Sequence, residues 1–318
     1  MKKGCLLLLV LCWVEVVSAQ FLHSGDTIAI ISPSSATDTT TINGGVRTLE
    51  KWGYRCVVGR NALNDDGHGF AGTIDERLSD LLWALREPSV KAVVCSRGGD
   101  GAAHLLGRLS LDTLRRYPKL IVGFSDVTAL LCAEARAGNR GIHGSMCHAL
   151  KTYEGNDTVS QTLRRMLEGE LPEYRVAPHP LNVEGKAEGI VVGGNLSVYN
   201  DLAGSDFDPL LLPGIILFME DTGEGMSKVD RMLHNMEIRG LLPNVRGIIV
   251  GQFNKYNHPE NGFDDMYAML HEYVRHYDIP VCFDFPVGHA HLRNFPLMTG
   301  ARAVLNVTSE GVTLRYNK

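Results

Sequence analysis

The chain has 318 residues, of which 44% are hydrophobic and 21% are charged, with a formal net charge of -5 and a pI of about 6.2. This balance is typical of a soluble globular protein, and the length suggests about two domains. Because the net charge is negative and no basic run is present, the sequence argues against a nucleic-acid partner.

The N-terminus has the pattern of a secretory signal peptide. Two lysines precede an apolar run over residues 5–14, and small residues lead up to Ala19. This pattern predicts a signal peptide over residues 1–19, cleavage after Ala19 and export, with the periplasm as the expected compartment. The apolar run is short and Glu15 interrupts it, so no stable membrane insertion is expected after cleavage.

The cysteines indicate neither a lipid anchor nor a disulfide framework. Leu11 stands where a small residue would precede a lipidated Cys12, so we do not expect a lipoprotein. None of the remaining cysteines has the spacing of a metal site, and we expect no metal and no cofactor. These cysteines are sparse, which favours buried thiols, and a single disulfide in an oxidising compartment is the alternative. They are Cys56, Cys95, Cys132, Cys147 and Cys282.

The first half of the mature chain alternates predicted strands and helices. Strands are predicted over residues 26–31, 54–58, 90–95 and 119–124, and helices over residues 42–51, 75–86, 102–108 and 127–137. This alternation predicts an α/β fold with a parallel sheet covered on both faces. In such sheets, ligands bind beyond the carboxyl ends of the strands. The residues predicted at such ends are Ser34, Gly98, Gly99, Ser125 and His143.

The second half repeats the alternation after a proline-containing interruption. A helix is predicted over 158–168 and a linker over 169–186, followed by strands over 187–192, 215–219, 245–251 and 281–283, helices over 196–203, 227–238 and 263–276, and a hairpin over 301–307 and 311–315. We therefore expect an N-terminal α/β domain over residues 20–155, a helix and linker over 156–186, and a C-terminal α/β domain over 187–318.

The stretch Gly123-Phe124-Ser125-Asp126 is the first candidate for chemistry. It lies between a predicted strand and a predicted helix, where a serine hydroxyl projects from the sheet and the next backbone N–H groups point the same way. Such a turn suits a nucleophile, because the attacking oxygen and the donors for an oxyanion come from one place. The alternative is that Ser125 or Asp126 only caps the helix.

Glu220 and His289 are the candidate partners of Ser125. Glu220 follows the predicted strand 215–219, where a carboxylate can orient an imidazole and stabilise its cation. His289 follows the predicted strand 281–283 and can act as a general base. Taken singly, a surface acid and a packed histidine are the alternatives, but all three residues fall at strand ends.

Short motifs are distributed over nearly the whole mature chain: Asp26–Pro33, Arg97-Gly98-Gly99, Gly123-Phe124-Ser125-Asp126, His143-Gly144, Gly193-Gly194-Asn195-Leu196, Leu217-Phe218-Met219-Glu220-Asp221, Asp230-Arg231 and Gly288-His289. Together, and in this order, they resemble the LD-carboxypeptidases, serine peptidase family S66, which includes the microcin C immunity peptidases. The fold implied by this resemblance is a Rossmann-like N-terminal domain with a parallel sheet, a C-terminal α/β domain and an active site between them, commonly in a homodimer.

The resemblance also implies the roles of individual residues. Ser125, Glu220 and His289 would form a catalytic triad. The oxyanion donors would be the backbone N–H groups of Asp126 and of Gly98 or Gly99. The implied reaction is hydrolysis of the amide bond before a C-terminal D-amino acid, D-alanine in a muropeptide tetrapeptide, through an acyl-enzyme on the serine.

Contacts with the substrate are less defined by the sequence. A carboxypeptidase needs a cation for the terminal carboxylate of its substrate. The candidates, among which the sequence does not choose, are Arg97, Lys228, Arg231 and Arg293. Asn195 is expected either to cap a helix or to contact the substrate.

Three departures from the family pattern point to differences in substrate choice. Asp100 stands where an aromatic residue usually follows the paired glycines, and Ser145 replaces a frequent proline. Residues 225–227 lack the aromatic residue often found after the catalytic acid. All three positions leave the triad unaffected.

Three other functions are open alternatives. A microcin C immunity-type peptidase acting on peptidyl-nucleotide amides would favour an aromatic platform, but Trp52 and Trp83 lie in N-terminal predicted helices. A metallohydrolase would need a ligand cluster around His289 and His291, and residues 271–276 have one residue too many for a zinc-binding helix. A non-catalytic periplasmic ligand-binding protein would also have two α/β domains and would need no nucleophile.

Overall fold

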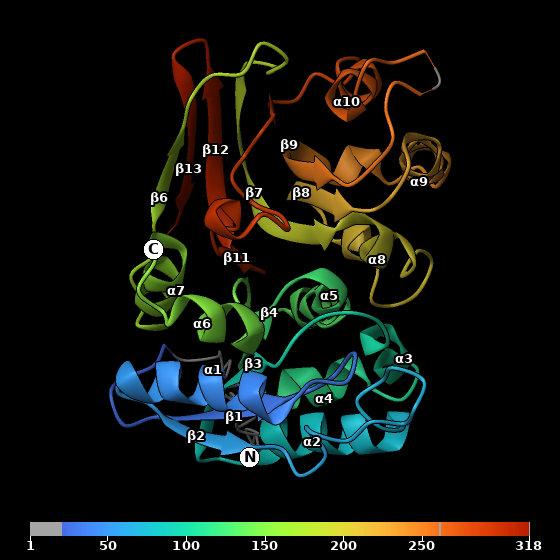
Figure 1. Ribbon diagram of the computed structural model, residues 1–318. Helices are drawn as coiled ribbons and strands as arrows, with labels where there is room; N and C mark the ends of the chain where they lie inside the picture. Colours follow the sequence, from blue (N-terminus) through green and yellow to red (C-terminus); the bar gives the residue numbers. More distant parts are fainter. Residues whose placement is uncertain (1–20, 261, 318) are drawn as a thin grey trace, which may run out of the picture.

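The computed structural model describes residues 21–260 and 262–317. Within these ranges the chain forms an N-terminal and a C-terminal α/β unit, each built on its own sheet, and Figure 1 shows the two units stacked. The predicted signal peptide, residues 1–19, lies outside the described residues. None of the described helices combines the length and the apolar character that a membrane span requires.

The N-terminal sheet is parallel apart from one edge strand. Its order is β11-β5-β4-β3-β1-β2. Its strands are β1 (Thr27–Ile31), β2 (Arg55–Val58), β3 (Val90–Cys95), β4 (Leu120–Gly123), β5 (Gly141–His143) and β11 (Leu297–Thr299). Every residue of β1 and β4 is buried, because helices cover both faces of the sheet, and this explains their continuous apolar sequences.

Two helical layers sandwich this sheet. One layer consists of α1 (Thr39–Lys51), α6 (Cys147–Tyr153) and α7 (Thr158–Leu167). The other consists of α2 (Ile74–Arg86), α3 (Ala102–Leu106), α4 (Leu111–Arg116) and α5 (Thr128–Ala137). Alternate residues of β1 point into the two layers, so that Ile28 and Ile30 join one core and Ile31 the other. The predicted parallel sheet with two covered faces is therefore confirmed.

The C-terminal sheet has a parallel half and an antiparallel half. Its order is β10-β9-β8-β7-β12-β13-β6. Its strands are β6 (Glu173–Val176), β7 (Gly185–Asn195), β8 (Ile215–Thr222), β9 (Val245–Asn254), β10 (Val281–Cys282), β12 (Arg302–Thr308) and β13 (Gly311–Tyr316). Helices α8 (Leu196–Asn200), α9 (Met226–Ile238) and α10 (Met266–Val274) lie beside the parallel strands β7, β8 and β9 in Figure 1. The short 3₁₀ helices η2 (Pro209–Leu211) and η3 (Leu242–Asn244) belong to the same half of the chain.

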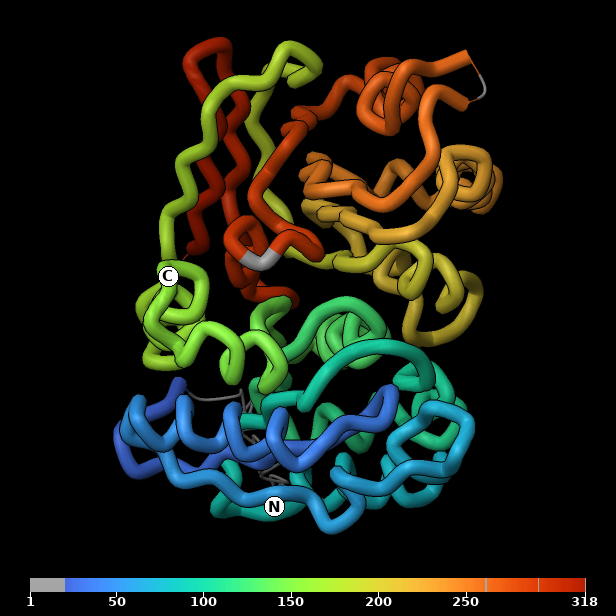
Figure 2. Tube along the Cα trace, viewed as in Figure 1, coloured from blue at the N-terminus to red at the C-terminus, as the bar shows by residue number. Residues whose placement is uncertain are grey.

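Several segments differ from the sequence prediction. Helices α4 and α6 form where no helix is predicted, and Glu220, predicted to follow its strand, lies within β8. The predicted linker, 169–186, contains β6, which pairs with β13. Residues 297–299, inside the predicted C-terminal domain, form β11, which pairs with β5 of the N-terminal sheet, and Figure 2 shows this red segment reaching the green N-terminal unit. Both strands are short, and their pairing partners are distant in the sequence, so local patterns carry little signal for them. The domain boundaries stay a prediction.

The cysteines of the described chain are free thiols, and all except Cys56 are buried. No disulfide therefore joins these residues. Burial raises the pKa of Cys56 and Cys282 to about 12. These thiols are consequently protonated at neutral pH and are poor nucleophiles.

Glu134 should make the fold less stable as the pH rises. Its side chain is fully buried on α5, where Nδ2 of Asn139 donates to Oε2 at 2.6 Å and Oε1 has no partner among the described residues. Burial raises the pKa of Glu134 to about 8, against an unperturbed value of 4.5. The folded state therefore retains a proton that the unfolded chain loses, which costs stability as the pH rises from 4.5 to about 8.

Urea denaturation at a series of pH values tests this prediction with the variant Glu134→Gln, whose amide stays neutral. The free energy of unfolding should fall less steeply in the variant than in the parent over that pH window. Equal slopes in the two proteins would contradict the prediction.

Candidate active site

Ser125 lies in the turn that joins β4 to α5, at the start of the 3₁₀ helix η1 (Ser125–Val127). Its φ is 60°, in the left-handed region that non-glycine residues rarely adopt. Gly123 permits the tight turn, because a Cβ at this position would lie 2.6 Å from Cγ1 of Val127. Backbone strain of this kind is concentrated at functional sites, and the strained turn places Ser125 just beyond the end of β4.

The glycine loop that follows β3 lies against Ser125. A Cβ on Gly98 would lie 2.9 Å from Cβ and 3.1 Å from Oγ of Ser125, so only glycine fits there. Gly99 has a φ of 117° and lies against Ser35. On the other side, Asp126 lies in the first helical turn, whose N–H groups have no partners within the helix. Backbone donors therefore flank the serine from two directions.

Two buried charged side chains hold this loop in place. Oδ2 of Asp126 accepts a hydrogen bond from the N–H of Ala102 at 2.8 Å. Arg77 is 2% exposed, and its Nη1 donates to the carbonyls of Pro33 and Gly101, each at 2.7 Å. Burial raises the pKa of the Asp126 carboxyl, against the opposing effects of its hydrogen bonds and of the Arg77 charge. The loop is thus fixed from both of its sides.

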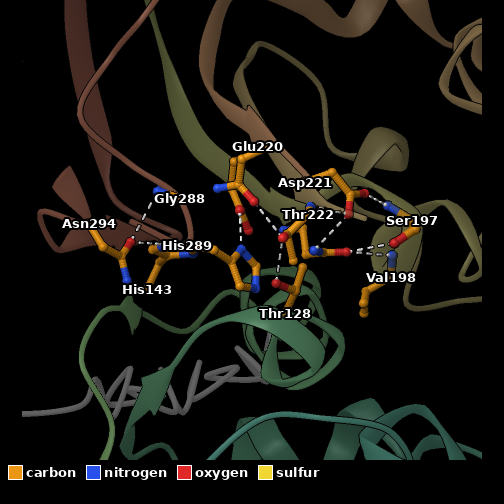
Figure 3. Close-up of polar contacts among 12 residues, drawn as sticks. Thr128, His143, Ser197, Val198, Glu220, Asp221, Thr222, Gly288, His289 and Asn294 are labelled. Atoms are coloured by element: carbon orange, nitrogen blue, oxygen red, sulfur yellow. Dashed lines mark hydrogen bonds and ion pairs between the residues drawn. The ribbon is translucent and has the colours of Figure 1, made fainter. Parts of the chain in front are cut away.

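Glu220 and His289 are paired in the C-terminal unit. Glu220 is fully buried in β8, and its Oε2 lies 2.6 Å from Nδ1 of His289. Figure 3 shows the imidazole between Glu220 and the N-terminal unit. Because Nδ1–H donates to the carboxylate, Nε2 is left as the acceptor, and it is buried without a hydrogen-bond partner among the described residues.

The environment of His289 favours its protonated form. Burial alone would lower the pKa of the imidazole, but the hydrogen bond and the charge of Glu220, with a contribution from Asp221, outweigh it and raise the pKa above the ordinary value of 6.5. A carboxylate that stabilises the imidazolium lets the ring accept a proton from a nucleophile during a reaction.

Asn294 holds the loop that carries His289. Its Oδ1 accepts a hydrogen bond from the N–H of Gly288 at 3.2 Å and lies 3.0 Å from Nε2 of His143 (Figure 3). Burial lowers the pKa of His143 to about 3, so this ring is neutral and donates its Nε2–H to the amide oxygen. The ring of Phe124 contacts both histidines, with centroids 5.2 Å from His289 and 5.7 Å from His143.

Ser125 and His289 line one cavity of about 250 Å³, although they belong to different units. Other residues that line it are Arg97, Gly98, Gly99, Phe124, Met146 and His148. The structure thus brings Ser125, His289 and Glu220 together in the order of a hydroxyl, an imidazole and a carboxylate. Nε2 of the imidazole has no hydrogen-bond partner in the described chain.

Asn195 caps α8 and does not line this cavity. Its Oδ1 accepts from the N–H of Val198 at 3.2 Å and from Oγ of Ser197 at 2.8 Å, and its Nδ2 donates to Oδ1 of Asp221 at 3.1 Å. With the side chain 4% exposed and both polar atoms engaged, the geometry favours the capping role over contact with a substrate. Burial raises the pKa of Asp221 to about 6.

The positions that depart from the family pattern lie outside the cavity. Asp100 is exposed, Ser145 is fully buried, and residues 225–227 lie at the start of α9, where Glu260 caps the helix. Within the described ranges, no three His, Cys, Asp or Glu side chains are grouped as metal ligands.

Sequence reasoning missed several residues of the site. Arg77 lies within a charged amphipathic helix and Asn294 in an irregular loop, and neither position has a local pattern that indicates its role. Met146 and His148 were not identified either. Their position in the sequence could have indicated them, because they come shortly after His143 at the end of its strand.

A strained serine after a parallel strand, beside a buried acid–imidazole pair, defines a serine hydrolase site on an α/β fold. Two family models match most of the chain: the LD-carboxypeptidase N-terminal domain over residues 28–144 and the LD-carboxypeptidase C-terminal domain over residues 188–305. The chain belongs to the LD-carboxypeptidase family, as its motifs predicted.

Individual relatives agree with this assignment. The chain is 31% identical over 297 residues to a probable murein peptide carboxypeptidase from Bacillus subtilis, with 91% of each protein covered. It is 26% identical over 331 residues to the microcin C7 self-immunity protein from Escherichia coli, covering 92% of this chain and 94% of the relative. The solved muramoyltetrapeptide carboxypeptidase from Oxalobacter formigenes is 27% identical, with a TM-score of 0.82, 92% of this chain covered and 99% of that chain. The predicted fold class and enzyme class are therefore confirmed.

Activation of Ser125 should require a neutral His289. Because the pKa of His289 is raised, the rate at which a fluorophosphonate labels the protein should increase with pH through a midpoint above about 6.5. Glu220→Gln removes the charge that counteracts the effect of burial on the pKa of His289. The midpoint of the variant should therefore lie below that of the parent, and its labelling should be slower. An unchanged midpoint in the variant would contradict the proposed coupling.

Gly98→Ala should inactivate the site without unfolding the protein. The new Cβ would collide with Ser125, and labelling should fall by about 10-fold or more, since small misplacements of reacting groups are costly. Gly107→Ala is the matched control, because its nearest atom would lie 3.7 Å away. Circular dichroism should be the same for both variants. Normal labelling of Gly98→Ala would refute the close approach of Gly98 to the side chain of Ser125.

Proposed function

We propose that this protein is a serine LD-carboxypeptidase that hydrolyses the amide bond before the C-terminal D-alanine of peptidoglycan tetrapeptides. The observation that carries the proposal is the cavity shared by Ser125 and His289, with Glu220 buried behind the imidazole. The substrate is supported by the relatives, one a probable murein peptide carboxypeptidase and one a muramoyltetrapeptide carboxypeptidase.

In the proposed acylation step, Oγ of Ser125 attacks the carbonyl carbon that precedes the terminal D-alanine. Nε2 of His289 accepts the serine proton, and Glu220 stabilises the resulting imidazolium through Nδ1–H. When the tetrahedral intermediate collapses, the imidazolium gives its proton to the leaving amine, and D-alanine departs. Water activated by the same imidazole then attacks the acyl-enzyme and regenerates Ser125.

Backbone N–H groups are proposed to hold the oxyanion of both tetrahedral intermediates. Asp126 supplies one donor from the first turn after the serine, and the loop of Gly98 and Gly99 supplies the other. Preorganised donors of this kind need no rearrangement as the charge develops. Their positions depend on Arg77, which fixes the loop, and on the carboxylate of Asp126 itself.

A peptidyl-nucleotide amide is the competing substrate within the family. A purine would be expected to stack on an aromatic side chain. Among the described residues that line the cavity, Phe124 is the single phenylalanine, tyrosine or tryptophan, and it already packs against His289. Trp52 is buried outside the cavity, and Trp83 lies on α2. These positions favour a cell-wall peptide.

The proposal also covers location and assembly. Export follows from the signal-peptide pattern of residues 1–19, with cleavage after Ala19 and a periplasmic mature protein. Homodimer formation, and a division into domains over 20–155 and 187–318, follow from the family resemblance and the order of predicted elements. Peptidoglycan fragments are available to an enzyme exported in this way.

Mass spectrometry of a muropeptide tetrapeptide incubated with the mature protein tests the proposal. We expect release of D-alanine, no cleavage of an all-L control, and loss of turnover by a factor of about 10⁴ or more in Ser125→Ala, with the fold retained. Intact tetrapeptide combined with cleavage of an aminoacyl-nucleotide amide would assign the competing substrate. Binding without turnover, unaffected by Ser125→Ala, would identify a ligand-binding protein.

A further inference from the structure

A carboxypeptidase that acts before a terminal D-amino acid must recognise the free carboxylate of the leaving residue. We propose that Arg97 binds this carboxylate and thereby restricts the enzyme to chain ends. The inference rests on the proposed function and adds the group that selects the substrate.

Arg97 is in the right place for this role. It follows the buried end of β3 and directly precedes Gly98, whose backbone lies against Ser125. Its side chain lines the cavity that contains Ser125 and His289. One loop can therefore offer a backbone donor to the scissile carbonyl and a cation to the carboxylate, which are separated by only one residue in a C-terminal D-alanine.

The guanidinium of Arg97 has unused donors. Nε donates to the carbonyl of Gly98 at 3.2 Å, and Nη1 donates to the carbonyl of Ala36 at 3.3 Å. An arginine has five N–H donors, so the remaining ones are available to a ligand. No acidic side chain pairs with Arg97 within the described ranges, so its charge is not neutralised locally. Two backbone contacts hold the group in place and reduce the entropy lost on binding.

Two of the other candidate cations are already paired. Nζ of Lys228 lies 2.6 Å from a carboxylate oxygen of Glu224. Nη2 of Arg293 lies 2.9 Å from Oδ2 of Asp284 and also donates to the carbonyl of that residue. Neither side chain lines the cavity of Ser125. A substrate carboxylate would have to displace an existing ion pair to reach them.

The remaining cations fit less well. Arg231 does not line the cavity, and its charge adds to the hydrogen bond from Ser227 in lowering the pKa of Glu260, which caps α9. Lys255 is exposed, and its charge offsets a small part of the rise in the pKa of His289 that Glu220 causes, so it lies near the site without lining the cavity. Lys255 is therefore the other candidate for binding the terminal carboxylate, and the experiment must distinguish it from Arg97.

The test compares two substrates, a muropeptide tetrapeptide ending in D-alanine and the same peptide ending in D-alaninamide. The parent should prefer the free acid by roughly 100-fold in kcat/KM, as expected for a charge-assisted bidentate contact. Arg97→Gln should lose most of this preference by cleaving the acid more slowly while changing little on the amide. Arg97→Lys should recover part of it, because the charge is kept and the planar fork is lost.

Two further variants complete the test. Arg115→Gln, on the exposed face of α4, is the matched control for loss of an arginine charge and should keep the preference. Lys255→Gln should also keep it. The inference would be overturned if Lys255→Gln lost the preference for the free acid while Arg97→Gln kept it. It would also be overturned if Arg97→Gln lowered kcat/KM equally for the acid and the amide. A parent that releases neither D-alanine nor D-alaninamide would refute the proposed function itself, which separates the two failures.

Discussion

The candidate active site depends on the contact between the first turn of α5 and the end of β7, because the candidate nucleophile Ser125 and the Glu220–His289 pair belong to different units. The N–H of Asn195 donates to Oγ1 of Thr128 at 3.1 Å, three residues after Ser125. Gly194 makes this approach feasible, since it has a φ of 136° and a Cβ there would lie 2.5 Å from Oγ1 of Thr128. A shift at this contact would separate Ser125 from His289.

Strand pairing connects this contact to Glu220, the proposed catalytic carboxylate. β7 pairs in parallel with β8, and Asn195 is the register partner of Glu220. This hydrogen bond and this strand pair, together with the hydrophobic core that α5 shares with the C-terminal unit, therefore help to set the distance from α5 to Glu220. After His289, the chain passes through Asn294 into β11, which joins the N-terminal sheet. The loop that carries His289 is consequently connected to both units.

Much of the fold was predictable because burial on both faces leaves apolar runs and helical periodicity in the sequence. Ser125, Glu220 and His289 were ambiguous one at a time, and their shared position at strand ends made them candidates. Arg77 and Asn294 were not predictable, because their partners are tertiary: Arg77 reaches a carbonyl 24 residues away and Asn294 a histidine 151 residues away. The three residues of β11 likewise acquire their partner only in the folded chain.

The two histidines beside Phe124 show how the hydrogen-bond partner decides the role of a buried imidazole. His143 is paired with the amide of Asn294, so burial dominates and its pKa falls to about 3. His289 is paired with the carboxylate of Glu220, which outweighs burial and raises its pKa. His143 can therefore hold the loop as a neutral donor without competing for the serine proton. A second imidazolium at that position would repel the imidazolium that the proposed mechanism forms on His289 and would oppose the proposed proton transfer.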